Sequence, residues 1–122
     1  MGISAVRGAC GVSEDSKEAI ITSVKACFEG LLEKNHLEEG DLACVMFTIT
    51  SDLRSKNPAG ALRASGHGSQ VPLFCMQEPE IEGMMPRCIR LLLILKEERE
   101  NLVPVYINGA EILRPDQFSS KH

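Results

Sequence analysis

The chain has few aromatic residues and no tryptophan. Its 122 residues include one tyrosine and four phenylalanines, so the core must be built from aliphatic side chains, with methionine and cysteine filling the gaps. Hydrophobic residues still make up 43% of the sequence and charged residues 25%, which is ordinary globular composition. This length predicts a single domain, residues 1–122, that folds without stapling by metals or disulfides.

Export and membrane signals are also missing. The N-terminal segment MGISAVRGAC carries Arg7 where the apolar part of a signal peptide would lie. The longest apolar run, LLLIL at 91–95, is far too short to span a bilayer. We therefore expect a cytoplasmic protein with no membrane partner.

The cysteines show no metal-binding or CxxC spacing. Their number, five, is odd, which favours free thiols in a reducing compartment and predicts no metal site. A catalytic thiol would need a neighbouring base. The only histidines, His36, His67 and His122, stand in no Cys–His motif and are interpreted as solvated surface residues. The pattern therefore disfavours a thiol enzyme.

The charge balance argues against nucleic acid as a partner. The formal net charge is −4, whereas a nucleic-acid-binding domain would present a basic face. An acidic protein can still bind an anion if its arginines converge in one cleft. Five arginines lie at or near the ends of predicted elements: Arg7, Arg63, Arg87, Arg90 and Arg114.

Two helices are predicted from capping signals and apolar periodicity. The first follows the capping-box pattern DSKE at 15–18 and should end near Asn35. The second should begin with Asn57 as N-cap and Pro58 at the first helical position, and end near Gly66. The apolar residues of the first helix recur at intervals of three and four, as one buried face requires: Ile20, Val24, Cys27, Phe28, Leu31 and Leu32.

Apolar runs predict the strands. They are ISAVRG at 3–8, LACVMFTIT at 42–50, VPLFCM at 71–76 and RCIRLLLILK at 87–96. The segment VYINGAEIL at 105–113 predicts a hairpin, because Asn-Gly favours a type I′ turn. This order predicts an α+β fold with a mixed β-sheet and helices on one face. The other face would then be free for self-association.

Single residues in these strands leave two interpretations open. Arg90 interrupts the apolar strand CIRLLLIL, and Glu78 ends the apolar segment VPLFCMQE, three residues after Cys75. A buried charge is costly unless it is paired or hydrogen-bonded. Either these charged side chains face solvent, as Arg7 and Arg63 also could, or polar partners meet them.

Several fragments together resemble a known family. VRGA, PAGALR, VPLFCMQE, CIRLLL, VYI and LRPD occur in one order between about Ile3 and Asp116. They resemble the small trimeric α/β class of chorismate mutases, as distinct from the all-helical class. The resemblance implies a homotrimer that forms a pseudo-α/β barrel, with active sites between subunits and no cofactor. The implied reaction rearranges chorismate to prephenate in one pericyclic step, without a nucleophile.

The resemblance also implies roles for individual residues. Arg90 would reach the ether oxygen and a substrate carboxylate, and Arg7 would bind a carboxylate. Glu78 would accept a hydrogen bond from the ring hydroxyl, with Cys75 beside it, and Tyr106 would lie near the side-chain carboxylate. The remaining implied substrate-binding residues are Phe74, Met76 and Gln77 in the pocket wall, and Arg63 and Arg114 at its mouth.

Two rival classes remain open. The family usually has an aromatic residue and a lysine where this chain has Asn57 and Gly60, which leaves room for a non-catalytic trimer that binds an anionic metabolite. A different enzyme on a similar trimeric fold, acting on imines or enamines, is the other alternative. That alternative gives no role to the CMQE and CIR segments.

Overall fold

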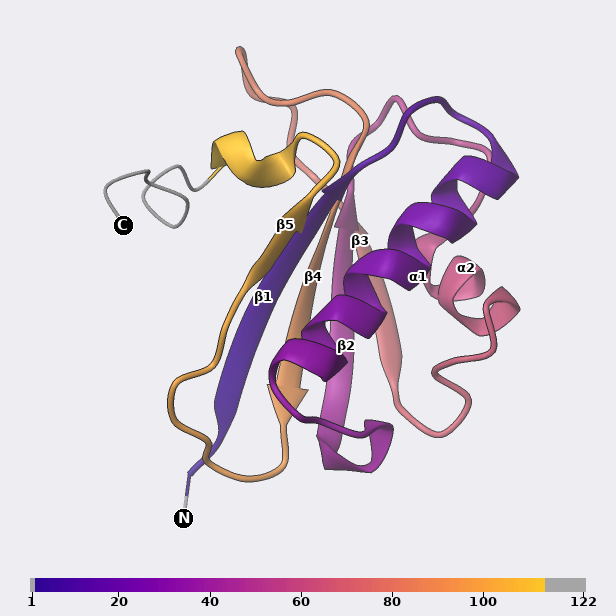
Figure 1. Cartoon of the computed structure of the whole chain (residues 1–122). Helices are drawn as coiled ribbons and strands as arrows, with labels where there is room; N and C mark the ends of the chain where they lie inside the picture. The colour runs from indigo at the N-terminus through magenta and orange to yellow at the C-terminus, as the bar shows by residue number, and fades with distance from the viewer. Residues whose placement is uncertain (1, 114–122) are drawn as a thin grey trace.

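The computed structural model describes residues 2–113, which form one five-stranded sheet with two α-helices and two 3-10 helices (Figure 1). None of the helices in this part of the chain has the length and apolarity that a bilayer crossing requires. The elements are β1 (Ser4–Gly11), α1 (Lys17–Lys34), η1 (Glu39–Asp41), β2 (Leu42–Ile49), α2 (Pro58–Ala64), β3 (Leu73–Gln77), β4 (Cys88–Leu95), β5 (Val105–Ile107) and η2 (Ala110–Leu113).

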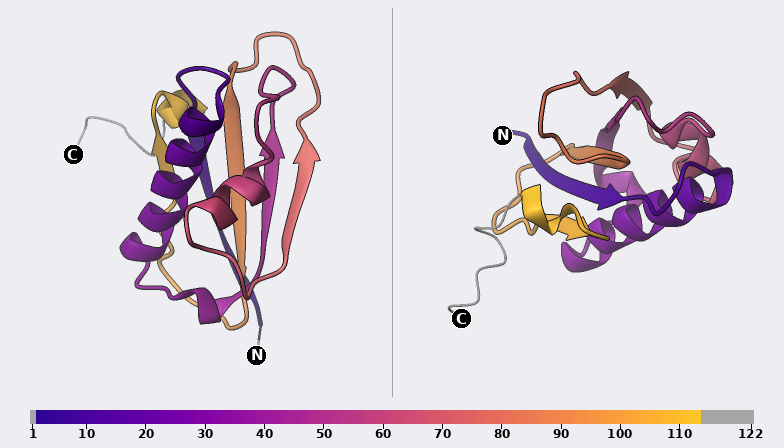
Figure 2. Two further views of the ribbon diagram at one scale, coloured as in Figure 1. Left: turned by 90° about the vertical axis from the view of Figure 1, so that its right-hand side faces the viewer. Right: turned by 90° about the horizontal axis from the view of Figure 1, so that it is seen from above.

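The sheet is mixed and has the strand order β3-β2-β4-β1-β5. The central strand β4 pairs antiparallel with β1 and β2, while the outer strands β3 and β5 pair parallel with β2 and β1. Both α-helices lie on the same side of the sheet (Figure 2). The predicted α+β class, with a mixed sheet and helices on one face, is confirmed.

The first helix begins one residue later than its sequence pattern suggests. Ser16 is the N-cap, and its hydroxyl accepts a hydrogen bond from the Ala19 N–H at 3.1 Å. The neighbouring Asp15 carboxylate instead accepts the N–H groups of Arg54 and Ser55, each at 2.9 Å. The predicted apolar face of α1 packs against β1 and β5. A Cβ at position 8 would lie 2.8 Å from Cδ1 of Leu31 and 2.9 Å from Sγ of Cys27, so Gly8 allows the close approach of α1 to β1.

The second helix follows its predicted signals. The Asn57 side chain caps α2 by accepting the N–H groups of Ala59 and Gly60, at 2.8 and 3.2 Å. Pro58 occupies the first helical position, where its missing N–H leaves no hydrogen bond unmade. Asn57 therefore stabilises the N-terminal end of this short helix, beside β3.

The predicted hairpin at Asn108-Gly109 is wrong. Both residues have the positive φ of a type I′ turn, 56° and 94°. The chain before the turn, β5, pairs in parallel with β1, and the chain after it forms η2 rather than a second strand. The turn chemistry thus set the local backbone conformation, but not the pairing partner of the flanking segments.

Candidate active site

The face of the sheet opposite the helices holds a cavity of about 420 Å³. Because side chains alternate along each strand, the strand register sorts them into rows across this open face. One row contains Arg90, with Thr48 and Ala9 directly opposite it on β2 and β1. The next row contains Arg7, paired with Leu92. The lining residues are Arg7, Met46, Thr48, Met76, Glu78, Arg90, Leu91 and Leu92.

Two arginines of adjacent strands converge on this cavity. Arg7 lies opposite Leu92 on β4, two residues from Arg90, and such diagonal neighbours are about 7–8 Å apart. One acidic residue, Glu78, also lines the cavity, so one positive charge remains in excess. A guanidinium group offers a planar fork of donors that matches a carboxylate. The arrangement is therefore suited to an anionic ligand with carboxylates.

Polar contacts hold the Glu78 side chain on the same open face of the sheet. Glu78 follows β3, and its backbone N–H bonds the carbonyl of Ile49 at 2.9 Å. Its Oε2 accepts the hydroxyl of Thr48 at 2.7 Å and lies 3.4 Å from Nε of Arg90. The Glu78 side chain is 16% exposed and that of Arg90 45%. The solvent-facing interpretation thus fails for Glu78, whereas Arg90 is both paired and accessible to a ligand.

A buried tyrosine and a buried thiol adjoin the arginine row. Tyr106 on β5 pairs with Ala9, which itself pairs with Arg90. Tyr106 packs in a small cluster with Ala9, Cys88 and Ala110 of η2. Burial raises the pKa of Cys88 to about 11, although the nearby Arg90 charge opposes this. The thiol is therefore neutral at physiological pH, which does not suit it to act as a nucleophile.

Within one chain, Cys75 lies on the other face of the sheet from Glu78, so the predicted placement of the two side by side is not met within a single subunit. Cys75 pairs with Phe47, a fully buried residue of the helix-covered core, and packs against that core. Its Sγ donates to Oδ1 of Asn57 at 3.2 Å. Cys75 is thus grouped with the start of α2. The thiols on the same face as Arg90 are Cys88, two residues before it on β4, and Cys44 on β2, which pairs with Ile94.

The remaining predicted residues are spread over three places. Phe74 lies on the open face opposite Met46 and is 60% exposed. Gln77 pairs with Ile49 and is exposed at the end of β3. Arg63 is exposed in the last turn of α2, on the helix side of the sheet, so it does not line the cavity. Arg114 lies outside the described residues.

His67 is not the solvated surface residue that its sequence context suggested. Its ring lies between two carboxylates, with Nε2 at 2.7 Å from Glu29 and Nδ1 at 2.8 Å from Glu39. Partial burial lowers the pKa of His67, but the two hydrogen bonds outweigh it and the pKa is raised above its ordinary 6.5. Only the protonated ring can donate to both carboxylates. His67 thereby ties the loop after α2 to α1 and η1.

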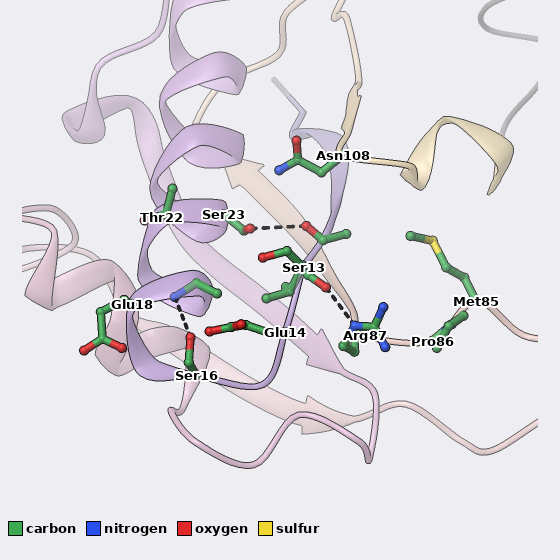
Figure 3. Close-up of a pocket in the computed structure, with 13 residues that line it drawn as sticks. Ser13, Glu14, Ser16, Glu18, Thr22, Ser23, Met85, Pro86, Arg87 and Asn108 are labelled. Carbon is green, nitrogen blue, oxygen red and sulfur yellow. Dashed lines mark hydrogen bonds between the residues drawn. The ribbon is translucent and has the colours of Figure 1, made fainter.

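A second, larger cleft of about 690 Å³ lies at the start of α1 (Figure 3). Its arginine, Arg87, already donates from Nε to the carbonyl of Val12 at 3.0 Å. Two carboxylates, Glu14 and Glu18, line the same cleft. With more negative than positive side chains, it is a poor match for an anionic ligand. The cavity of the open face therefore remains the candidate site.

Four residues that line the cavity are not predicted from the sequence: Met46, Thr48, Leu91 and Leu92. The sequence indicates Thr48 only as part of an apolar strand, and it does not distinguish Cys88, which adjoins the site, from the other core cysteines. The signal for Thr48 is its polar side chain at an alternate position of the run MFTIT. That alternation places it on the same face as Met46, rather than on the face of Phe47.

Comparison with known proteins gives one consistent result. The family model "Chorismate mutase type I" matches residues 3–117. Chorismate mutase AroH of Bacillus subtilis is 32% identical, over 100% of this chain and 98% of its own length. Chorismate mutase AroH of Thermus thermophilus is 36% identical, over 98% and 99%. A solved chorismate mutase from Clostridium thermocellum has a TM-score of 0.83 and 33% identity, and covers 89% of this chain and 98% of that one. This chain therefore belongs to the type I chorismate mutase family.

Proposed function

We propose that the cavity of the open sheet face catalyses the rearrangement of chorismate to prephenate, the activity of the family as an isomerase. The observation that carries this proposal is the convergence of Arg7 and Arg90, from adjacent strands, on a cavity that also holds Glu78. The substrate has two carboxylates, and the cavity has the excess positive charge that an anionic ligand requires.

The reaction needs restraint and electrostatics rather than covalent chemistry. One C–O bond breaks while one C–C bond forms within the same molecule, and no proton has to move. The protein must hold the flexible enolpyruvyl chain over the ring. It must also stabilise the negative charge that develops on the ether oxygen. No nucleophile is required, which agrees with the neutral Cys88 thiol beside Arg90.

Each charged residue has a separate task in this scheme. Arg90 donates to the ether oxygen and to one carboxylate, and Arg7 binds a carboxylate from the adjacent strand. Glu78 accepts a hydrogen bond from the ring hydroxyl. The Met46 and Leu92 side chains form the apolar floor between them. Tyr106 lies in the Arg90 row, beyond Ala9, and is buried rather than part of the cavity lining within one chain.

A homotrimer would complete the site. The open face exposes Phe74 and Met76 and carries further apolar side chains from β2 and β4, so association between copies would remove this surface from water. Arg63 and Cys75 lie on the helix side, away from the cavity of their own subunit. In the trimer they would contribute, with Asn57, to the site of a neighbour. The unpaired thiols favour a reducing compartment such as the cytoplasm.

Ultraviolet detection of chorismate disappearance tests the activity. Purified protein should convert chorismate to an equal amount of prephenate, and Arg90→Ala should remove most of the rate. Arg99→Ala is the matched control, because Arg99 pairs with Asp41 outside the cavity. Binding of prephenate without turnover would instead identify a non-catalytic metabolite-binding protein. Light scattering should give three times the 13.3 kDa chain mass, and a monomer at micromolar concentration would contradict the trimer.

A further inference from the structure

Glu78 is held by two successive residues of β2. Its backbone N–H bonds the carbonyl of Ile49 at 2.9 Å, and its Oε2 accepts the Thr48 hydroxyl at 2.7 Å. Thr48 lies directly opposite Arg90 on β4 and Met76 on β3. The hydroxyl is therefore placed by the sheet register on the side from which the carboxylate enters the cavity.

The two carboxylate oxygens of Glu78 have different surroundings. Thr48 and Arg90 both approach Oε2, at 2.7 and 3.4 Å. Among residues 2–113, none donates a hydrogen bond to Oε1. An ionised carboxylate can accept at both oxygens. A ligand hydroxyl in the cavity would therefore find one oxygen occupied and the other available.

We propose that Thr48 is a positioning residue that holds Oε2 of Glu78, so that Oε1 is presented to the ring hydroxyl of the substrate. The inference rests on the proposed function, because it assigns the partner of the Oε1 atom in that reaction. Thr48 itself does not touch the substrate in this role. It acts through Glu78, and its contribution depends on the hydroxyl rather than on the shape of the side chain.

Two substitutions separate the hydroxyl from the packing. Thr48→Val keeps the branched shape and the strand preference but removes the donor, whereas Thr48→Ser keeps the donor. Loss of a hydrogen bond to a charged group should lower kcat/KM roughly tenfold in Thr48→Val. The loss should appear mainly as a higher KM, because the ring hydroxyl is bound equally in the ground and transition states. Thr48→Ser should stay within a few-fold of the parent.

A modified substrate tests the route through Glu78. Chorismate with its ring hydroxyl methylated cannot donate to Oε1, so the parent enzyme should process it much less well than chorismate. Thr48→Val should discriminate less between the two substrates, since Oε1 of Glu78 is already misplaced in this variant. If Thr48 only supports the sheet, both substrates should lose activity in the same proportion. That result would overturn the inference.

Crystal structures of the parent protein, Thr48→Val and Thr48→Ser test the positioning role of Thr48 independently of any activity measurement. Thr48→Val should show the Glu78 carboxylate turned away from its place beside Arg90, and Thr48→Ser should show it retained. An unmoved carboxylate in Thr48→Val would refute the positioning role even if the rate fell. If the parent protein proved inactive towards chorismate, the proposed function would fail, while the carboxylate position would still decide the role of Thr48.

Discussion

Replacement of Arg90 by lysine separates catalysis from folding. The Arg90 side chain is 45% exposed and contacts Glu78 only through Nε, at 3.4 Å. A partly exposed ion pair contributes about 0–1 kcal/mol to stability. Glu78 would also keep its Thr48 hydrogen bond at 2.7 Å. Arg90→Lys should therefore change the free energy of unfolding by less than about 1 kcal/mol.

The effect on the reaction should be far larger. Lysine retains the charge but loses the planar fork and part of the reach. Loss of one preorganised donor to a developing negative charge costs about 3–4 kcal/mol, or roughly a hundred- to thousandfold in rate. The loss should appear chiefly in kcat, because this contact strengthens in the transition state. Arg90→Ala should lose more, since it also abandons a substrate carboxylate.

Steady-state kinetics, together with urea unfolding and light scattering of each variant, test this reasoning. Arg99→Lys provides the matched control, because it makes the same exchange at an arginine that pairs with Asp41 outside the cavity. If Arg90→Lys folds and associates like the parent and keeps kcat within a few-fold, Arg90 is an ordinary strand residue. The proposed role of Arg90 as the donor to the ether oxygen of the substrate would then be wrong.

Three further predictions concern a thiol, a histidine and a glycine. Cys75→Ser should retain most of the activity, since serine can still donate to the start of α2; complete loss of turnover in a folded variant would count against a reaction without a nucleophile. His67 has a raised pKa, so its contribution to stability is complete below about pH 6.5 and is lost as the pH rises through the folded-state pKa. Urea unfolding should therefore show His67→Gln about 1 kcal/mol less stable than the parent at pH 5.5, with the gap narrowing by pH 9; a constant gap would contradict the carboxylate contacts. Gly11→Ala would place a Cβ 2.0 Å from a backbone oxygen and should lower the free energy of unfolding by about 1–3 kcal/mol; an unchanged urea midpoint would contradict this packing.

The helices and the strands of the core were predictable because their signals are local. The apolar residues of α1 recur with the helical period, and Asn57-Pro58 marks the start of α2. The hairpin prediction is wrong because the pairing of strands is not decided by local signals. The residues Asn108 and Gly109 dictate a turn with positive φ, but whether β5 pairs with its successor or with β1 depends on the whole sheet.

The charged residues of the site could be predicted from the sequence, but the faces of the sheet on which they lie could not. No local pattern tells whether Arg90 faces the helices or the open side, because β4 is apolar on both faces. For Cys75, the alternation of side chains along a strand does indicate the face of the sheet on which it lies. Cys75 lies one residue from Phe74 and from Met76, which both belong to the open face, so its side chain must point to the helices. The resemblance alone placed the thiol beside Glu78.

The site depends on strand register because its polar groups come from four segments. Arg7 is on β1, Thr48 on β2, Arg90 on β4, and Glu78 follows β3. A slip of one residue in any pairing would turn that strand's side chains to the opposite face. The register is set mainly by the buried rows of the other face, where Phe47 pairs with Leu91. The apolar residues under the helices therefore determine where the arginines and the carboxylate of one subunit lie, so a change in the packing of these apolar residues should alter the site without touching any of its charged groups.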